Sequence, residues 1–266
     1  MGTRRALISN ACIGIISGGI LAAAIAGCSS KHVTPASQQA VHMQPSSAPK
    51  QDAEQVRKGK LLFDQTPKYA FHYVGNQLAC ADCHTQSGTA DYAAPLIDVA
   101  GLFPMFSKRA GREITLKDRI DECFVRSETG RPLPDNSPEM LALVAYIQSL
   151  SRGGMNGKSY AKRGLVNLPA LKGDAARGRS VYVQAQCTIC HGSNGAGVPP
   201  VMPPLWGSGS FNDGAGMNNQ EKMAAYVYQN MPQNHPRSLT AQQAYDVAAY
   251  IHSKPRPKFN PAYRSF

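Results

Sequence analysis

The chain has 266 residues and carries 28 Lys and Arg against 17 Asp and Glu, a formal net charge of +11. Seven cysteines are an odd number, which argues against a framework built from disulfide bonds alone. The positive charge favours anionic partners but does not separate a small anion from an acidic protein.

The N-terminus has the pattern of an export signal, which we predict for residues 1–27. Arg4 and Arg5 precede a largely apolar stretch, and the segment ends in small residues. The sequence I-A-G-C that ends at Cys28 resembles the lipobox of bacterial lipoproteins. We therefore expect a periplasmic protein that is anchored to a membrane through a lipid on Cys28. An ordinary secretion signal and an uncleaved membrane anchor remain alternatives.

Residues 28–50 are rich in Ser, Gln, Pro and Ala and lack periodicity. Such a composition cannot bury a core and predicts a flexible tether. The rest of the chain is long enough for two domains of about 100 residues. We place them at residues 51–152 and 173–254, separated by a linker at 153–172.

The first of these domains is predicted to begin and end with a helix. Residues 52–64 form the first helical candidate. The last opens at Ser137, a predicted N-cap that is followed by Pro138. Its apolar positions then recur with helical spacing as far as Ile147.

The second domain repeats this order. A helical candidate covers residues 174–186, another covers 221–230, and Thr240 with Gln243 forms a capping box at the start of a last helix. Strand signals are weak throughout, so the expected fold class is all-α. The basic tail, residues 255–266, receives no role from the sequence.

Each domain contains one C-x-x-C-H pentapeptide, C-A-D-C-H from Cys80 to His84 and C-T-I-C-H from Cys187 to His191. The pattern is typical of c-type haem attachment. The cysteines Cys80, Cys83, Cys187 and Cys190 would bind the vinyl groups, and the two histidines would ligate iron. A bare redox or zinc pair is the alternative, but the repetition favours two covalently bound haem c groups. The arrangement resembles two class I cytochrome c domains in tandem.

A second iron ligand is expected in each domain. For the second haem we choose Met231, because it ends a helical run and meets Pro232. Met202, Met217 and Met223 are the other methionine candidates, and His235 is a rival.

The first domain has a cysteine where the second has Met231. Cys123 follows His84 by 39 positions, and Met231 follows His191 by 40. On spacing alone, a haem ligand and an inert buried cysteine are equally acceptable. Arg119 and Ser127 lie four residues to either side, on the same helical face as Cys123.

Further arginines surround this helix in sequence, namely Arg109, Arg112 and Arg126. Arginines beside a thiol favour its ionised form and offer charge-assisted hydrogen bonds to a small oxyanion. A solvated basic helix face is the plainer interpretation.

The run R-I-D-E-C-F-V-R-S-E-T-G-R-P-L-P-D-N-S-P-E-M-L-A-L-V-A-Y-I, residues 119–147, resembles the dihaem thiosulfate dehydrogenases. The run P-P-L-W-G-S-G-S-F-N-D-G-A-G-M, residues 203–217, is similar to the second domain of that family. The family oxidises two thiosulfate ions to tetrathionate, and some members run the reaction in reverse. The resemblance implies His84 and Cys123 as the axial ligands of the active-site haem. It also implies Arg109, Arg119 and Ser127 as substrate-binding residues.

The implied mechanism counters the repulsion between two dianions with the positive charge of the arginines. By the family proposal, Cys123 also forms a transient sulfur adduct with one thiosulfate. Electrons would pass through the second haem to an acceptor protein. Some members carry a lysine beside the methionine ligand, whereas this chain has Asn230.

Charge agrees with an anionic substrate. Removing Arg4 and Arg5 with the signal changes +11 to +9, and up to four haem propionates leave about +5. Nucleic acid does not suit an exported haem protein. Two other functions stay open: a non-catalytic dihaem electron-transfer cytochrome, and a subunit like the His/Cys-ligated cytochromes of the Sox sulfur-oxidation system.

Overall fold

The computed structural model describes residues 48–152 and 160–266. The predicted export signal, Cys28 and most of the predicted tether lie outside the described residues. Within the described residues, no helix is both long and apolar enough to cross a membrane.

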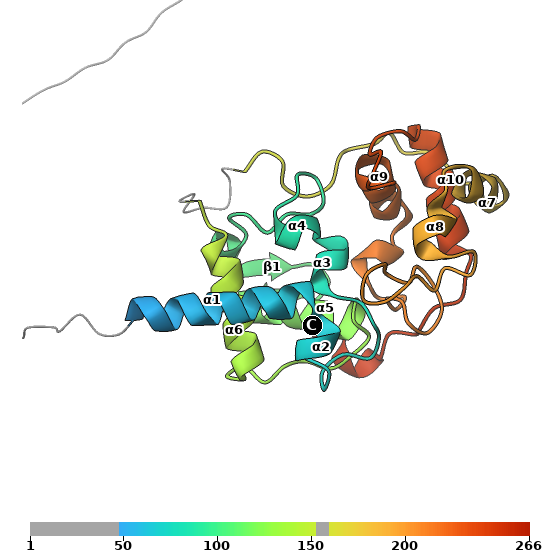
Figure 1. Ribbon diagram of the computed structural model, residues 1–266. Coiled ribbons are helices and arrows are strands. Elements are labelled where there is room, and N and C mark those ends of the chain that lie inside the picture. Colours follow the sequence, from blue (N-terminus) through green and yellow to red (C-terminus); the bar gives the residue numbers. More distant parts are fainter. Residues whose placement is uncertain (1–47, 153–159) are drawn as a thin grey trace, which may run out of the picture. The chain divides into compact units, whose positions relative to one another are not determined.

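The first domain is built on two helices, α1 (Ala48–Asp64) and α6 (Pro138–Ser149), which cross and pack against each other (Figure 1). At the crossing, a Cβ on Gly59 would lie 1.9 Å from the carbonyl oxygen of Ala142, so only glycine permits this approach. Ser137 caps α6 by accepting from the amide of Met140 at 3.1 Å, as the sequence predicted. The remaining helices of this domain are α2 (Thr66–Tyr69), α3 (Cys80–Cys83), α4 (Thr85–Gly88), the 3₁₀ turn η1 (Ala100–Leu102) and α5 (Leu116–Arg126).

The second domain repeats this crossing with α7 (Ala175–Gln184) and α10 (Ala241–His252). A Cβ on Gly178 would again lie 1.9 Å from a carbonyl oxygen, that of Asp246. The predicted capping box of Thr240 and Gln243 is confirmed. The other elements of this domain are α8 (Cys187–His191), η2 (Gly216–Asn218) and α9 (Gln220–Asn230), and the C-terminal tail contains the 3₁₀ turn η3 (Pro261–Tyr263).

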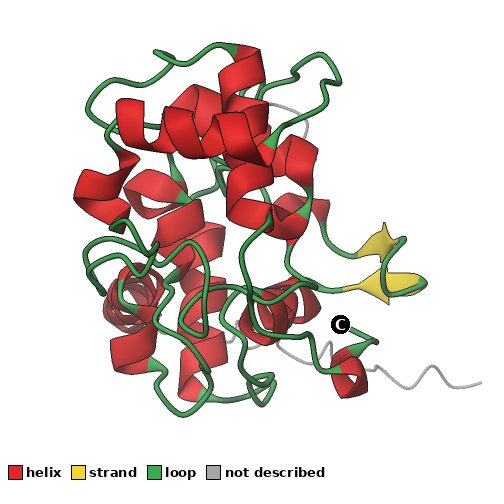
Figure 2. Ribbon diagram, turned by 90° about the vertical axis from the view of Figure 1, so that its right-hand side faces the viewer, coloured by secondary structure: helices red, strands yellow, loops and turns green. Residues whose placement is uncertain are grey.

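One short antiparallel hairpin departs from the all-α expectation. Strands β1 (Met105–Ser107) and β2 (Arg112–Ile114), yellow in Figure 2, form this hairpin. Their register pairs Met105 with Ile114 and Ser107 with Arg112. The turn between them places Gly111 at a φ of +69°, a conformation that favours glycine. The mostly helical architecture is otherwise as predicted.

The two domains share buried contacts. Leu78, two residues before the first C-x-x-C-H motif, is 4% exposed and belongs to the hydrophobic core of the second domain. Tyr226 on α9 donates a hydrogen bond to the carbonyl of Asp82 at 3.1 Å, inside the first motif. The C-terminal tail also reaches the first domain, since Arg126 of α5 donates to the Phe266 carbonyl at 2.5 Å.

Candidate functional site: two cavities at the C-x-x-C-H motifs

Both C-x-x-C-H motifs form a helical turn, and both histidine rings are held in the same way. The Nδ1 atom of His84 lies 2.6 Å from the Ala94 carbonyl, and that of His191 lies 2.9 Å from the Pro203 carbonyl. A carbonyl can only accept, so each Nδ1 carries the proton and each Nε2 keeps its lone pair. This is the arrangement in which a histidine ligates a metal.

The charge state of the rings agrees with this role. Removal from water lowers the pKa of His84 to about 4 and also lowers the pKa of His191. Both imidazoles are therefore neutral near pH 7, which is the metal-binding form. Paired thiols on one turn and a neutral, oriented imidazole beside them fit a covalently bound haem in each domain.

The first cavity, of about 490 Å³, brings together residues that are distant in the sequence. His84 and Cys123 both line it, although 39 positions separate them. Arg109, Arg119 and Ser127 line the same cavity. All five residues that the sequence assigned to the first haem's iron and to the substrate thus meet in one place.

Cys123 lies near the C-terminal end of α5, and Arg119 lies one turn before it. The Nη1 atom of Arg119 approaches the Cys123 sulfur at 3.6 Å and Glu122 Oε2 at 2.9 Å. The arginine does lower the pKa of the thiol, as expected. Loss of hydration raises that pKa by more, so the net shift is upward, contrary to the expectation of an ionised thiol.

Arg126, one of the arginines expected around Cys123, lines the first cavity, and so do two lysines that sequence reasoning did not place there, Lys108 and Lys222. Lys222 belongs to α9 of the second domain, and no local sequence signal could have placed it in this cavity. Arg126 is buried, and loss of hydration together with the nearby Arg109 lowers its pKa.

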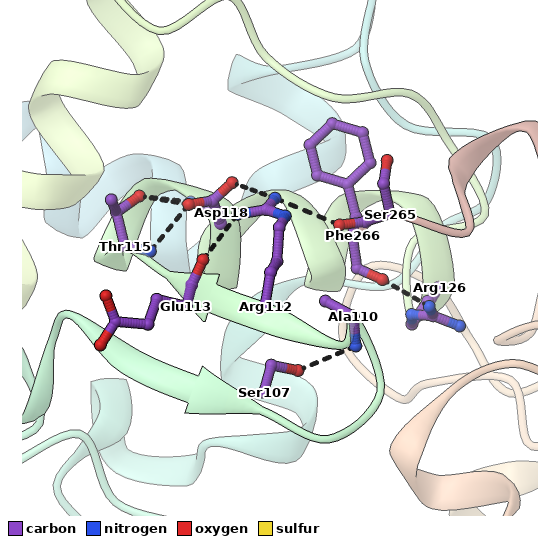
Figure 3. Close-up of polar contacts among 9 residues, drawn as sticks. All are labelled: Ser107, Ala110, Arg112, Glu113, Thr115, Asp118, Arg126, Ser265 and Phe266. Carbon is purple, nitrogen blue, oxygen red and sulfur yellow. Dashed lines mark hydrogen bonds and ion pairs between the residues drawn. The ribbon is translucent and has the colours of Figure 1, made fainter.

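Arg112 is not part of the cavity lining, contrary to the expected oxyanion pocket. Its guanidinium donates instead to Asp118 at 2.7 Å and to the carbonyl of Ser265 at 3.1 Å, as Figure 3 shows. Asp118 also accepts from the Thr115 amide at 2.7 Å, which caps the start of α5. Arg112 therefore ties the hairpin, α5 and the tail together.

The second cavity, of about 1420 Å³, is lined by Cys187, Cys190 and His191. Met231, at the C-cap of α9, lines it as predicted, but so do His235 and the other three methionine candidates. The choice of Met231 as iron ligand therefore stays a prediction. Cys83 also lines this cavity, whereas Cys80 lines the first, so the turn α3 stands between the two.

Comparison with known proteins agrees with this geometry. The family model for the SoxA/TsdA cytochrome c domain matches residues 69–155, and the cytochrome c model matches residues 175–254. The fold and the two motif cavities thus define a c-type cytochrome with two cytochrome c domains in tandem, as predicted.

Individual relatives show which family of two-domain c-type cytochromes the chain belongs to. The chain is 39% identical over 216 residues to a thiosulfate dehydrogenase of Allochromatium vinosum, covering 77% of this chain and 80% of the relative. It is 38% identical to a thiosulfate dehydrogenase of Thiomonas intermedia, covering 76% and 66%. The chain belongs to the thiosulfate dehydrogenase family. This confirms the resemblance and the prediction that the chain is an oxidoreductase.

A solved structure, the thiosulfate dehydrogenase TsdBA of Marichromatium purpuratum in its as-isolated form, superimposes with a TM-score of 0.72 at 34% identity. The match covers 85% of this chain and 50% of the solved one, so this chain spans half the length of that protein.

Proposed function

We propose that this chain oxidises two thiosulfate ions to tetrathionate and releases two electrons, in the cavity lined by Cys123. One observation carries the proposal: a candidate sulfur ligand, a neutral histidine and several cations line a single cavity, although the sequence separates them widely. Family membership supports the same substrate.

Positive charge is the main requirement of this reaction. Two unit charges 4 Å apart interact by about 4 kcal/mol at an effective dielectric constant of ~20, so two dianions at that distance repel by about 16 kcal/mol. Arg109 and Arg119 would bind the two ions and offset this repulsion, and Ser127 would donate a further hydrogen bond. Lys108 and Lys222 add to the same positive field.

When bound, a haem in each cavity would supply an iron that takes up electrons one at a time. Cys80 and Cys83 would hold the first haem covalently, and His84 and Cys123 would bind its iron. Because hydration loss disfavours a free Cys123 thiolate, a cation such as iron is needed to keep this sulfur ionised.

The second cavity would hold a haem on Cys187 and Cys190, with His191 and Met231 as the residues that bind its iron. We propose that electrons leave from there to an external acceptor protein. The lysine that some members carry beside the methionine is replaced by Asn230, which donates to the Tyr226 carbonyl at 3.2 Å. A ligand exchange between lysine and methionine is therefore not expected.

The proposal is tested by mixing the purified holoprotein with thiosulfate and ferricyanide. We expect ferricyanide bleaching that depends on thiosulfate and a matching yield of tetrathionate. Bleaching at the same rate without thiosulfate would contradict the proposed activity and favour an electron-transfer cytochrome without catalysis.

Replacing the sulfur ligand gives a sharper test. We expect Cys123→Gly to retain both haems, shown by the absorbance of the pyridine haemochrome, and to lose thiosulfate turnover. Arg112→Gln is the matched control, because Arg112 neighbours α5 without lining the cavity. Turnover that survives in Cys123→Gly would require another group to ligate or attack.

A second function deserves a test, because the matching family model covers SoxA as well as TsdA. A Sox-type subunit would oxidise thiosulfate only together with partner proteins. Activity of the purified chain alone therefore argues for the dehydrogenase, and activity restricted to mixtures argues for the subunit.

We also propose that the protein is exported to the periplasm and is lipid-anchored through Cys28. The pattern of residues 1–28 supports this. Mass spectrometry of the mature N-terminus tests the proposal: a diacylglyceryl group on Cys28 is expected, and a free amine at another residue would contradict it.

A further inference from the structure

The helix that carries Cys123 is capped at its C-terminal end by polar groups that include a residue of the second domain. The last carbonyls of a helix have no partner within it. In α5, the Val125 carbonyl accepts from the side-chain amide of Asn212 at 2.8 Å, and the Arg126 carbonyl accepts from the backbone amide of Asn212 at 3.1 Å. The Ser127 carbonyl accepts from the side chain of Asn76 at 2.8 Å.

Asn212 is itself held firmly. Its side chain is 1% exposed, and its Oδ1 accepts from the Gly214 amide at 3.0 Å. The preceding Phe211 belongs to the hydrophobic core of the second domain and lies 4.2 Å beneath the guanidinium of Arg256. The following Asp213 accepts from the Phe259 amide at 2.8 Å. The loop Ser210–Gly214 is therefore anchored in the second domain while it contacts the first.

Asn76 extends the same network toward the first haem-attachment motif. It is 5% exposed, and its side-chain amide also donates to the Ser210 carbonyl at 3.0 Å. Its Oδ1 accepts from the Leu78 amide at 3.0 Å, two residues before Cys80. One buried side chain thus joins the end of α5, the loop of the second domain and the start of the motif.

These contacts give a role to the part of residues 203–217 that does not line the second cavity. Residues 203–217 resemble the family's second domain, and within them Asn212 and Gly214 contact α5 and line neither cavity. We propose that the loop Ser210–Gly214 positions the catalytic helix, with Asn212 as the positioning residue that fixes where Cys123 and Ser127 stand. This inference rests on the proposed function.

The physical reason is the geometry of the site. A misplacement of about 1 Å can reduce a rate by about a hundredfold. Cys123 and Ser127 lie in and just after the last turns of α5, so the groups that hold its end also set their positions. Asn212→Asp keeps the size of the side chain but replaces the donor to Val125 with an oxygen that repels the carbonyl. Asn212→Ser is milder, because it removes the donor to Val125 without placing a charged oxygen against that carbonyl, and in both variants the backbone amide still binds Arg126.

The experiment compares wild type, Asn212→Asp and Asn212→Ser holoproteins with Thr240→Ala. Thr240 caps α10 of the same domain and lies outside both cavity linings, so its variant measures destabilisation alone. Haem content, the electron paramagnetic resonance of each ferric haem without substrate, and kcat and KM for thiosulfate are recorded.

We expect the resonance of the first haem to change in both Asn212 variants while that of the second does not. We also expect kcat to fall about tenfold or more in Asn212→Asp and less in Asn212→Ser, with wild-type behaviour in Thr240→Ala. A first-haem signal and kcat unchanged in both variants would overturn the inference. Loss of both haems from both variants would do the same, since the loop would then be a general folding determinant.

The resonance comparison needs no thiosulfate. It therefore tests the positioning role even if the wild type fails to oxidise thiosulfate, which would defeat the proposed function alone.

Discussion

The side chain of Arg119 has to bind groups of the protein and also leave donors free for the proposed anionic substrate. Its guanidinium contacts the Cys123 sulfur and the carboxylate of Glu122, and it faces the cavity proposed for a dianion. Glu122 is 5% exposed, and its Oε1 has no hydrogen-bond partner among the described residues. The acid therefore fixes Arg119 in place while the remaining donors of the guanidinium stay available.

We expect Arg119→Met to lower kcat/KM for thiosulfate about 10- to 150-fold, which corresponds to the roughly 1.5–3 kcal/mol of a hydrogen bond to a charged group. Arg119→Lys keeps the charge but not the planar fork, so it should recover only part of this loss. Steady-state kinetics measure both. Equal activity of Arg119→Met and wild type would remove Arg119 from the substrate site.

The sequence predicted which residues surround Cys123 but not the sign of the net pKa shift. Helical spacing places Arg119 and Ser127 on one face with Cys123, and that pattern is local. Hydration loss depends on every element around the cavity, including Lys222 of the second domain, and no local pattern contains it.

At the scale of elements, each of the two helix crossings depends on a glycine at the point of contact. Gly59 and Gly178 each let a helix approach a carbonyl oxygen so closely that a Cβ would overlap it. Alanine is the better helix former by about 1 kcal/mol, but that gain cannot offset a clash with backbone.

We therefore expect Gly59→Ala and Gly178→Ala to lower the free energy of unfolding by about 2 kcal/mol or more, measured by urea denaturation of the holoprotein. Gly209→Ala is the control, because its Cβ would meet only Pro204 at an ordinary 3.5 Å. If Gly59→Ala were as stable as wild type, the two helices could move apart without lowering the free energy of unfolding.

The start of α5 carries a pH-dependent contribution. Bonds from Arg112 and Thr115 outweigh hydration loss and hold the pKa of Asp118 at about 2, below its ordinary 3.8. A lowered folded-state pKa means that the stabilisation is complete above about pH 4 and is lost as the pH falls toward 2.

We expect Asp118→Asn to be less stable than wild type by about 1 kcal/mol at pH 7. The difference should shrink as the pH falls from about 4 to 2. Urea midpoints at pH 7, 5 and 3 provide the measurement, and a difference that is constant across this range would contradict the assigned cause.

Helix caps were predictable because Ser137, Thr240 and Gln243 bond within four residues. The hairpin of β1 and β2 was not, because three-residue strands are too short to show an alternating pattern.

At the scale of the whole molecule, the excess of positive charge attracts the anionic substrate toward the protein. At roughly 10 mM salt, charges are screened from one another beyond about 30 Å. At about 0.1 M salt, this distance falls to about 10 Å. Thiosulfate should therefore be attracted over a shorter range as salt increases.

We expect KM for thiosulfate to rise several-fold between about 10 and 300 mM NaCl while kcat changes little. Lys222→Gln should weaken this dependence, because Lys222 lines the cavity. Lys58→Gln should not, since Lys58 lies on α1 and pairs with Glu54 at 2.8 Å. Identical salt dependence of the two variants would show that only net charge matters.

The tandem arrangement was predictable because each domain carries its own motif and terminal helices. The contacts between the domains were not, since they join single residues such as Asn76 and Ser210 across 134 positions.

The two domains differ in the number of residues between the helix crossing and the C-x-x-C-H motif. Gly59 precedes Cys80 by 21 positions, whereas Gly178 precedes Cys187 by nine. The surplus in the first half includes α2 and the segment with Asn76 and Leu78, which touches the other half. The longer segment of the first domain therefore supplies contacts that hold the two cytochrome c domains together.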